Sequence, residues 1–477
     1  MNLTQKIAVI GAGPAGITAA YQLAKAGAYV EVLEASPHIG GMARTFPLWG
    51  QRVDVGPHRF FSSDVRVNSL WLEVVGTDYA MVNRLTRIYY KKKFFNYPLQ
   101  PFNALAGLGL AEATNCIISY GLSRLNSSTA PGGSFEDWVV NRFGRRLYEI
   151  FFKSYSEKLW GIPCKELDAD FAAQRIRKLS LSGAILNALF PKKNKHRTLV
   201  DCFAYPLEGT GMVYERMARH ITERGNIVRL NSPVSKLTTE RDKVLFLTLE
   251  DGRTVGADHF ISTMPLTLLV RALGITDPEV FHACSELRFR NTTLVYLLCD
   301  SSSLFPDQWL YIHSPELGMG RVTNFRNWVP QLYGDSPHTI LCLEYWSQED
   351  GVWASPENDV IATATKEIHS TGLLGGAKVL DGKVIRVPRC YPIYRRGYAK
   401  HVKTIADALA RFKNLHVIGR YGSFKYNNQD HSILMGLLAA ENIRTGANHD
   451  LWAVNSDYEN YQEAAIITKT GLQKIPS

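Results

Sequence analysis

The chain has 477 residues, 45% of them hydrophobic, and carries a formal net charge of +10. This length exceeds one typical core, so we expect two or three packed domains. The charge predicts an anionic partner: phosphate groups, an anionic membrane surface or, ranked last because no recognition motif is present, nucleic acid. The seven cysteines are scattered without a CxxC pair, which argues against a disulfide framework and a structural metal site and favours a reducing, cytoplasmic compartment.

The most specific motif is KIAVIGAGPAG at residues 6–16, a strand, a glycine turn and a helix start. Gly11 permits the tight turn, Gly13 lets the backbone approach a pyrophosphate, and Gly16 allows close packing of helix and strand. The next apolar run ends at Glu34, whose carboxylate can accept hydrogen bonds from a ribose. We therefore predict a dinucleotide site that includes Gly11, Gly13, Pro14, Ala15, Gly16, Glu34 and Ala35.

The glycine turn alone leaves NAD and FAD open, and the residues after Glu34 separate them. Gly40 and Gly41 let a second backbone segment approach the cofactor, and Arg44 can pair with a phosphate or lie near a flavin. This two-part arrangement resembles the signature of the flavin superfamily that contains amine oxidases, protoporphyrinogen oxidases, phytoene desaturases and UDP-galactopyranose mutases. The resemblance implies FAD.

Residues 61–205 have mainly helical patterns, such as the one over 135–143. The weakly polar stretch 101–122 is expected to form a buried or interfacial helix rather than a membrane span. Lys91, Lys92 and Lys93 are typical of a charged hairpin turn. The basic residues between Arg175 and Arg197 predict either a mobile lid that grips a diphosphate or an anionic membrane, or a solvated basic face.

Strand patterns return at residues 227–234, 244–249, 254–263, 292–299, 339–346 and 415–420. We therefore expect an α/β fold with a discontinuous, Rossmann-like FAD-binding domain and a mixed-sheet substrate domain. The expected division is FAD-binding residues 1–60, 206–275 and 401–450, a helical lid region 61–205, a substrate sheet 276–400 and a tail 451–477.

Five later segments favour one branch of the superfamily. They are residues 54–61, 94–99, 155–161, 391–398 and 419–430. All but the fourth resemble segments of UDP-galactopyranose mutases, whose histidine-bearing loop corresponds here to His58. The fourth fits mutases and protoporphyrinogen oxidases equally.

The resemblance implies three sets of site residues. The catalytic candidates are His58, Arg59, Tyr391 and Arg395. Further cofactor-binding candidates are Gly41, Met42, Arg44, Pro57, His58, Val234, Gly419, Arg420, Asn428, Gln429 and Ser432. Substrate-binding candidates are Phe95, Tyr97, Trp160, Arg175, Tyr394 and Tyr426.

Several of these residues also have plain structural interpretations. His58 can simply bond a nearby carbonyl, Trp160 can be a core residue, and Asp430 can cap the helix that begins beside it. Strand alternation is expected to place Arg389 and Tyr391 on one face.

The predicted function is that of an FAD-dependent enzyme acting on an activated sugar, linked to a nucleotide or a lipid phosphate, by redox-neutral mutase or epimerase chemistry. The alternative is an amine-oxidase-like or protoporphyrinogen-oxidase-like oxidoreductase with a non-sugar substrate. We expect a cytoplasmic protein, with peripheral contact at the inner face of an anionic membrane kept open. The oligomeric state stays open as well.

Overall fold

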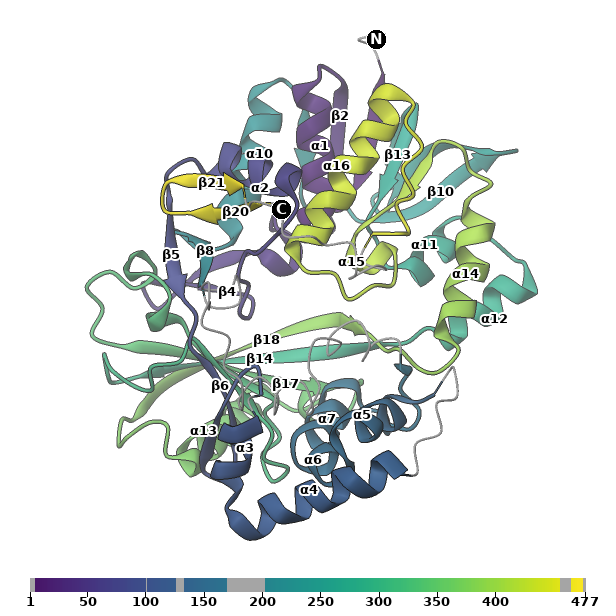
Figure 1. Cartoon of the computed structure of the whole chain (residues 1–477). Coiled ribbons are helices and arrows are strands. Elements are labelled where there is room, and N and C mark those ends of the chain that lie inside the picture. The colour runs from purple at the N-terminus through teal and green to yellow at the C-terminus, as the bar shows by residue number, and fades with distance from the viewer. Residues whose placement is uncertain (1–4, 100, 126–132, 170–201, 455–464, 475–477) are drawn as a thin grey trace.

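The computed structural model describes residues 5–99, 101–125, 133–169, 202–454 and 465–474. Its upper half contains a five-stranded, fully parallel sheet, here called the cofactor sheet (Figure 1). The strands come from three distant stretches of the chain. Their order is β19 (Leu415–Val417), β13 (His259–Ser262), β1 (Lys6–Ile10), β2 (Tyr29–Leu33) and β9 (Ile227–Arg229).

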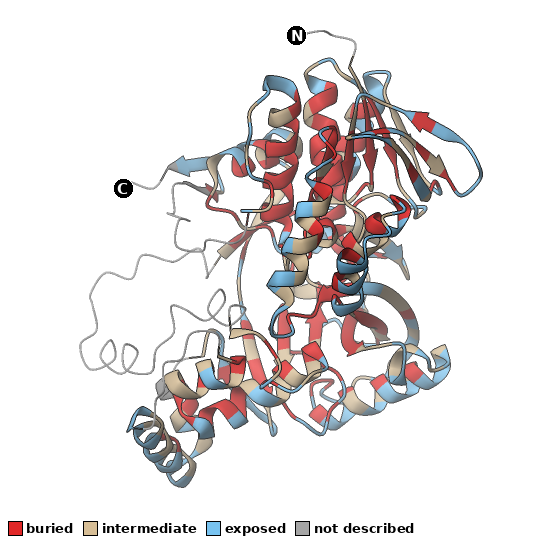
Figure 2. Cartoon of the chain, turned by 90° about the vertical axis from the view of Figure 1, so that its right-hand side faces the viewer, coloured by how far each residue is buried: buried red, intermediate tan, exposed pale blue. Residues whose placement is uncertain are grey.

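Both faces of the cofactor sheet are covered, as its strand pattern requires. Ile7 and Val9 of β1 face the helices α1 (Pro14–Lys25), α10 (Gly211–Glu223) and α16 (Gln429–Thr445). Ala8 and Ile10 face the opposite way, into the core shared with the antiparallel sheet of β10 (Val234–Glu240), β11 (Lys243–Leu249) and β12 (Thr254–Gly256). Figure 2 shows the helices beside the sheet buried along much of their length.

The substrate sheet in the lower half has seven strands and a mixed character. Only β15 and β6 pair in parallel; the other neighbours are antiparallel. Helix α13 (Glu357–Thr371) packs against β18 and β14. The strand order is β18 (Val379–Pro392), β14 (Phe289–Cys299), β17 (Thr339–Ser347), β16 (Arg321–Asn324), β15 (Trp309–Ile312), β6 (Thr86–Tyr90) and β7 (Lys93–Asn96).

The described residues within 61–205 are divided between three parts of the molecule rather than forming one helical region. Helix α2 (Val65–Val75) packs on α10 and α16 in the core beside the cofactor sheet. Strands β6 and β7 form a hairpin, with its turn at Lys91 and Lys92, and this hairpin is part of the substrate sheet. Strand β5 (Tyr79–Asn83) pairs with β8 (Cys202–Pro206). The helices at the lower end are α3 (Pro101–Leu108), α4 (Leu110–Leu125), α5 (Phe135–Phe143), α6 (Arg145–Tyr148) and α7 (Ser154–Trp160).

The helix predicted over 135–143 is α5, with the same bounds. The helix expected over 101–122 is present but broken at Gly109, whose φ of +89° ends α3. Among the described residues, no helix combines the length and apolarity that a bilayer crossing needs. The basic segment 175–197 lies outside the described residues.

Short elements connect these parts. Hairpin β3–β4 follows the second glycine pair, and hairpin β20–β21 packs on α2.

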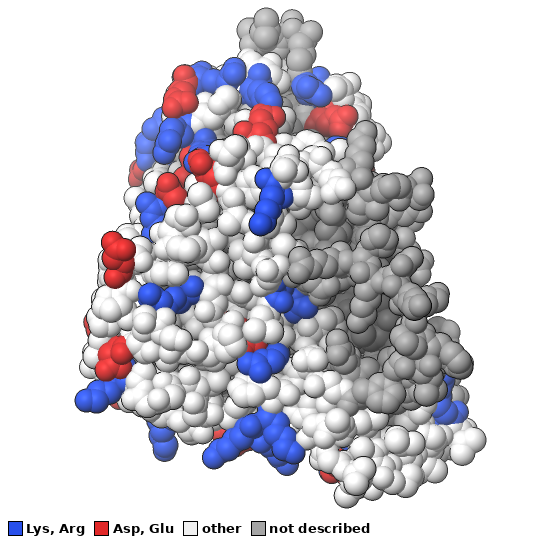
Figure 3. Space-filling view, turned by 60° about the vertical axis from the view of Figure 1, so that its left-hand side comes forward, with Lys and Arg blue, Asp and Glu red and all other residues white. Residues whose placement is uncertain are grey.

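On the face drawn in Figure 3, basic side chains predominate over acidic ones in the lower half, in keeping with the positive net charge. The remaining bounds are β3 (Thr45–Leu48), β4 (Gln51–Asp54), α11 (Leu266–Ala272), α12 (Pro278–Glu286), α14 (Tyr398–Leu409), α15 (Gly419–Gly422), β20 (Ala465–Thr468), β21 (Gly471–Lys474), η1 (Gly41–Ala43), η2 (Glu149–Lys153), η3 (Phe325–Asn327), η4 (Pro330–Leu332) and η5 (Gly351–Trp353).

The packing of α1 on α16 gives a test of the fold. A Cβ at Gly436 would lie 2.5 Å from the carbonyl oxygen of Ala15, whereas a Cβ at Gly121 of α4 would meet nothing within 4 Å. Gly436→Ala should therefore destabilise the protein by about 1–3 kcal/mol through overpacking. Gly121→Ala should stabilise it by up to about 1 kcal/mol, because alanine favours a helix. Thermal unfolding measures both; equal shifts would contradict the close approach of α1 and α16.

Candidate functional site

The two glycine segments of the N-terminal motif lie against each other. A Cβ at Gly41 would lie 3.2 Å from Cα of Gly13, and the amide of Gly40 donates to the carbonyl of Ala12 at 2.9 Å. A Cβ at Gly13 itself would meet nothing within 4 Å, so open space lies before the start of α1. This arrangement of bare backbone at a helix N-terminus fits a pyrophosphate.

Glu34 is fixed beside the glycine turn by two backbone amides. Its Oε2 accepts from the amide of Ala12 at 2.7 Å and its Oε1 from that of Ser36 at 2.9 Å. The amide of Ser232 donates to its carbonyl, which brings the start of β10, with Val234, to the same end of the sheet. The free lone pairs of the Glu34 carboxylate are the acceptors that a ribose hydroxyl would need.

Arg44 is a half-buried cation beside this motif. Burial lowers the pKa of its guanidinium, and Glu34 is close enough to oppose that shift. Among the described residues the guanidinium has no hydrogen bond or ion pair, although burying a charge without one is costly. An unpaired arginine at the end of the second glycine pair fits a cofactor phosphate, and the dinucleotide thus fits the residues present.

The start of α16 closes the cofactor site from the other side. Gln429 donates from Nε2 to the carbonyl of His58 at 3.3 Å, and its Oε1 accepts from the hydroxyls of Thr210 at 3.0 Å and Tyr214 at 2.6 Å. Asn428, rather than Asp430, is the N-cap residue of α16, and Ser432 lies buried in its first turn. Gly419 approaches the same place, since its Cβ would lie 3.2 Å from that of Ala15.

His58 is held in one tautomer. Its Nε2 lies 2.8 Å from the carbonyl oxygen of Val55, which can only accept, so Nε2 carries the proton. Burial, together with the charges of Arg321 and Arg420, lowers the pKa of the ring to about 4. The imidazole is therefore neutral near neutral pH, and its Nδ1 is an acceptor.

Arg420 joins the two halves of the molecule. Its guanidinium donates to the carbonyl of Cys390 at 3.0 and 2.8 Å and to that of Asn427 at 2.9 Å, and it lies 4.2 Å from the ring centroid of Tyr426. Sγ of Cys390 in turn lies 3.5 Å from Sδ of Met42, which follows the second glycine pair. Within the described part of the chain no carboxylate is bonded to Arg420.

A second arginine, Arg321, lies on the substrate sheet, and its charge is neutralised by an acid. Arg321 makes a bidentate ion pair with buried Glu344, at 2.5 and 2.6 Å, and donates to the hydroxyl of Tyr391 at 3.3 Å. A Cβ at Gly56 would lie 3.5 Å from Oε1 of Glu344. The ion pair therefore adjoins the loop that carries His58.

Aromatic side chains surround this junction. The ring of Trp160 lies 6.1 Å from Tyr391, 5.8 Å from Tyr394 and 6.1 Å from Tyr426, and Tyr391 stacks on Tyr426 at 5.3 Å. Trp160 is only 1% exposed, which is what the interpretation of this residue as a core side chain predicts. Tyr155 stacks on His313 at 4.6 Å, and the structure gives its hydroxyl no hydrogen bond to any described residue.

Two further cations near the junction are held by backbone carbonyls. Nζ of Lys158 donates to three of them at 3.1–3.2 Å, and burial lowers its pKa to about 8. Arg290, also buried, donates to the carbonyls of Lys158, Leu159 and Trp346. Tyr155 and Lys158 lie within segment 155–161, which resembles the mutases, but nothing in the sequence marks Lys158 itself, because carbonyl partners have no side-chain pattern. Arg290 lies outside every predicted segment, and Arg321 could have been found only from its bond to Glu344.

Some predicted residues lie elsewhere. Arg59 is exposed over the ring of Phe61, and Arg395 is exposed and paired with Glu166 at 2.9 Å. Phe95 is fully buried against Phe151 in the core. Tyr97 is 42% exposed, beside Tyr311. Arg175 falls outside the described residues.

The expected alternation along β18 is wrong at its end. The register of β18 against β14 shifts between Val387 and Tyr391, and Arg389 has a φ of +55°. Arg389 is therefore exposed whereas Tyr391 is buried. The bulge and the left-handed backbone of Arg389 interrupt the regular pleat, so Arg389 no longer shares a face with Tyr391, and sequence alternation cannot predict this.

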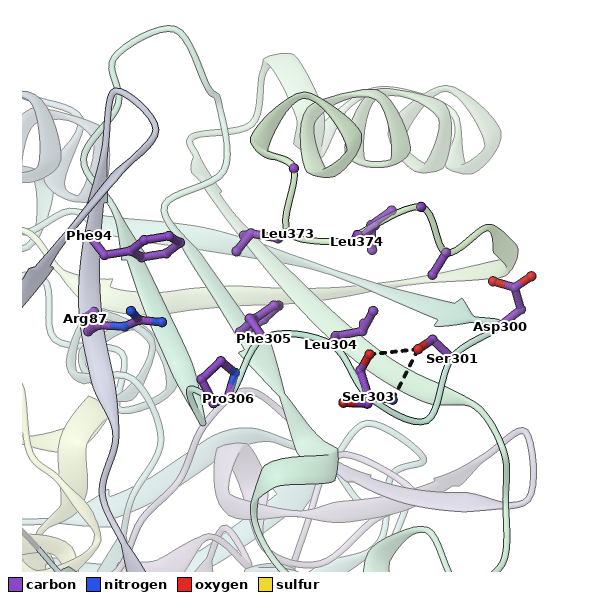
Figure 4. Close-up of a pocket in the computed structure, with 14 residues that line it drawn as sticks. Arg87, Phe94, Asp300, Ser301, Ser303, Leu304, Phe305, Pro306, Leu373 and Leu374 are labelled. Atoms are coloured by element: carbon purple, nitrogen blue, oxygen red, sulfur yellow. Dashed lines mark hydrogen bonds between the residues drawn. The ribbon is translucent and has the colours of Figure 1, made fainter.

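A separate pocket of about 620 Å³ lies on the substrate domain, between β6, β7 and the loops at 300–306 and 372–377 (Figure 4). Its one lining arginine, Arg87, is paired with buried Asp307 at 2.6 and 2.9 Å, so its charge is already compensated. None of the predicted site residues lines it. We therefore place the candidate site at the junction between the two sheets.

The unpaired guanidinium beside the glycine turn predicts the effect of its removal. Arg44→Ala should weaken FAD binding about ten- to a hundredfold, the loss expected for one charge-assisted bond to phosphate. Flavin retention on dialysis and titration of the apoprotein measure it. Arg52→Ala, which removes an exposed arginine paired with Glu208, is the matched control. Equal loss in both variants would refute a phosphate role for Arg44.

The depressed pKa of His58 predicts a pH dependence of stability. Between pH 6.5 and about 4 the unfolded chain binds a proton at this ring while the folded protein does not, so stability falls as pH is lowered through that range. His58→Gln should remove this component, worth up to about 3 kcal/mol, from the thermal unfolding of the FAD-loaded protein. Exposed His38→Gln should leave the profile unchanged. An unaltered slope in His58→Gln would show that the ring is not buried in its neutral form.

Comparison with known proteins shows which proteins the chain resembles in sequence. An L-amino-acid oxidase from Bungarus fasciatus is 34% identical over an alignment of 489 positions, which covers 92% of this chain and 86% of that enzyme. Another, from Gloydius blomhoffii, is 26% identical, and the match covers 61% of this chain and 59% of that enzyme. A dTDP-fucopyranose mutase from Escherichia coli is 30% identical, with 34% of this chain and 44% of that mutase covered. The matches thus span about half the length of the last two relatives.

The fold is shared over nearly the whole chain. A crystal structure of reduced UDP-galactopyranose mutase matches with a TM-score of 0.82 at 21% identity, covering 96% of this chain and 98% of that one. An engineered putrescine oxidase matches with a TM-score of 0.64 at 15% identity over 93% and 99%. The model of the flavin-containing amine oxidoreductase family matches residues 14–444. The chain therefore belongs to the flavin-containing amine oxidoreductase family, and its cofactor is FAD.

Proposed function

We propose that this flavoenzyme acts on an activated sugar, carried by a nucleotide diphosphate or a lipid phosphate, and rearranges it without net oxidation. The observation that carries the proposal is the guanidinium of Arg420, which lies at the junction with carbonyl partners and no bonded carboxylate from any residue that the structure describes. Removing a cation from water without a counter-charge is costly unless an anion completes the site. A phosphate group supplies that anion.

The neighbouring cations extend this argument. Arg290 and Lys158 also donate to carbonyls, whereas Arg321 is the one of these four cations with a bonded acid, Glu344, among the residues described. Three cations held in this way suit an extended anion such as a diphosphate better than a single carboxylate. The mutases among the relatives, one named for a dTDP-linked sugar and one for a UDP-linked sugar, act on ligands of this class.

The aromatic residues suit the sugar itself. The buried rings of Trp160 and Tyr391 exclude water from the junction, and the partly exposed ring of Tyr426 would offer an apolar face to a pyranose. Tyr155 has a hydroxyl without a bond to any described residue, so it can bond a sugar hydroxyl or a phosphate oxygen. These groups would position the substrate while the buried arginines hold its anionic part.

The chemistry is divided between protein and cofactor. FAD, when bound, supplies the redox or nucleophilic centre. His58, neutral and protonated on Nε2, presents Nδ1 as an acceptor, so its role is to accept a hydrogen bond or a proton and not to polarise a carbonyl by donation. Gln429 positions it by holding the His58 carbonyl.

A second candidate is an oxidase of an amino acid or amine. The long match to the Bungarus fasciatus L-amino-acid oxidase favours it, and Arg420 could equally bind a substrate carboxylate. Such an enzyme would reduce its flavin stoichiometrically and release peroxide in air, whereas a redox-neutral enzyme would not.

Anaerobic incubation of the FAD-loaded protein separates the two. The panel contains nucleotide sugars, polyprenyl-phosphate sugars and L-amino acids, each with and without dithionite. Conversion of a sugar that requires reduced flavin supports the mutase, and conversion without net bleaching supports the epimerase. Bleaching by an amino acid, followed by peroxide on admission of air, would replace the proposal by the second candidate.

Tyr155→Phe tests the substrate site. Loss of one unpaired hydroxyl should raise KM for the active sugar roughly three- to tenfold, with little change in kcat, because the bond acts on substrate binding. The melting temperature should stay the same, since the hydroxyl bonds no described residue. Tyr29→Phe, at the start of β2 and 40% exposed, is the control. An unchanged KM would remove Tyr155 from the site.

A further inference from the structure

Helix α4 carries a continuous exposed stripe of large apolar side chains. Leu110 is 91% exposed, Ile117 and Ile118 are each 56%, Leu122 is 58% and Leu125 is 84%. The spacings of seven, eight, twelve and fifteen residues from Leu110 place all five on one side of a helix. The helix lies at the lower end of the molecule, away from the cofactor sheet (Figure 1).

The opposite side of α4 is fixed, so the helix cannot turn to bury this stripe. Cys116 is 1% exposed, and the hydroxyl oxygen of Ser119 accepts from the amide of Arg146 at 3.1 Å. A Cβ at Gly144 would lie 2.8 Å from Cα of Tyr120, which shows how closely the two backbones approach. The apolar stripe is therefore the outer face of a firmly docked helix.

Basic residues lie near both ends of α4, with Lys91 close to Glu112 in its first turn and Arg124 in its last turn. Lys91 and Lys92 form the exposed turn between β6 and β7, and Lys93 ties that hairpin to the C-terminal end of α3 through the carbonyl of Gly107 at 2.8 Å. The single acid of α4, Glu112, is ion-paired with Arg146.

We propose that α4 lies in the interface of an anionic lipid bilayer, with Ile117, Ile118 and Leu122 among the acyl chains and Lys91 and Lys92 against the lipid phosphates. An amphipathic helix with an apolar stripe and a basic flank has this binding mode. Charge favours this occupant over a second copy of the chain, because a copy has the same net charge of +10. The proposal does not depend on the substrate or the reaction.

Co-sedimentation of the full, FAD-loaded chain with vesicles tests the proposal. Binding is expected to vesicles of phosphatidylcholine mixed with phosphatidylglycerol, and much less to pure phosphatidylcholine. The double variant I117E/I118E should bind at least roughly tenfold more weakly, since two buried apolar anchors become charged. The variant K91E/K92E should lose mainly the preference for anionic vesicles.

Phe281→Glu, on α12, is the matched control, because Phe281 is 64% exposed but lies outside the stripe. It should bind vesicles as the unaltered protein does. Flavin content and melting temperature confirm that each variant is folded. The proposal is overturned if the unaltered protein does not bind anionic vesicles, or if I117E/I118E binds them equally well. It is also overturned if that variant only dissociates a dimer.

Discussion

The position of Arg420 is the constraint on which the rest of the site depends. Its guanidinium bonds the carbonyl of Cys390 at the end of β18 and that of Asn427 just before α16. One planar cation thus fixes the last strand of the substrate sheet against the part of the cofactor domain that follows β19. Because Cys390 also contacts Met42, the second glycine pair is held in register with the aromatic residues of the substrate sheet. The candidate cofactor-binding and substrate-binding residues therefore meet at this junction.

Cations held by carbonyls give the site its electrostatic character. A carbonyl satisfies the donors of Arg290 or Lys158 but does not neutralise their charge, so the junction keeps a positive potential in surroundings of low polarity. The lowered pKa values of Lys158 and His58 are responses to the same burial. The protein thus keeps His58 neutral, as an acceptor, beside cations that would attract an anionic ligand.

Local motifs were predictable from the sequence, and long-range pairings were not. Spacings within a few residues predicted the glycine turn at 11–16, the acid Glu34 and helix α5. The assignment of FAD rested on the ten residues that follow Glu34. The Arg321–Glu344 pair joins residues 23 apart through antiparallel strands, and the partners of Lys158 lie more than 150 residues away. The exposure of Arg389 depends on a bulge in β18. The exposure of the α4 stripe depends on which side of α4 packs against Gly144.

The distribution of these cations also bears on the choice between the two candidate reactions. In an amino acid the carboxylate is attached to the carbon that is oxidised, so one cation close to the flavin is enough. In an activated sugar the phosphates extend away from the reacting carbon, and their charge is spread over a longer path. Here the cations come from three elements: Arg420 from α15, Arg290 from β14 and Lys158 from α7. Such a spread matches the extended anion, which is the physical reason to rank the sugar substrate first.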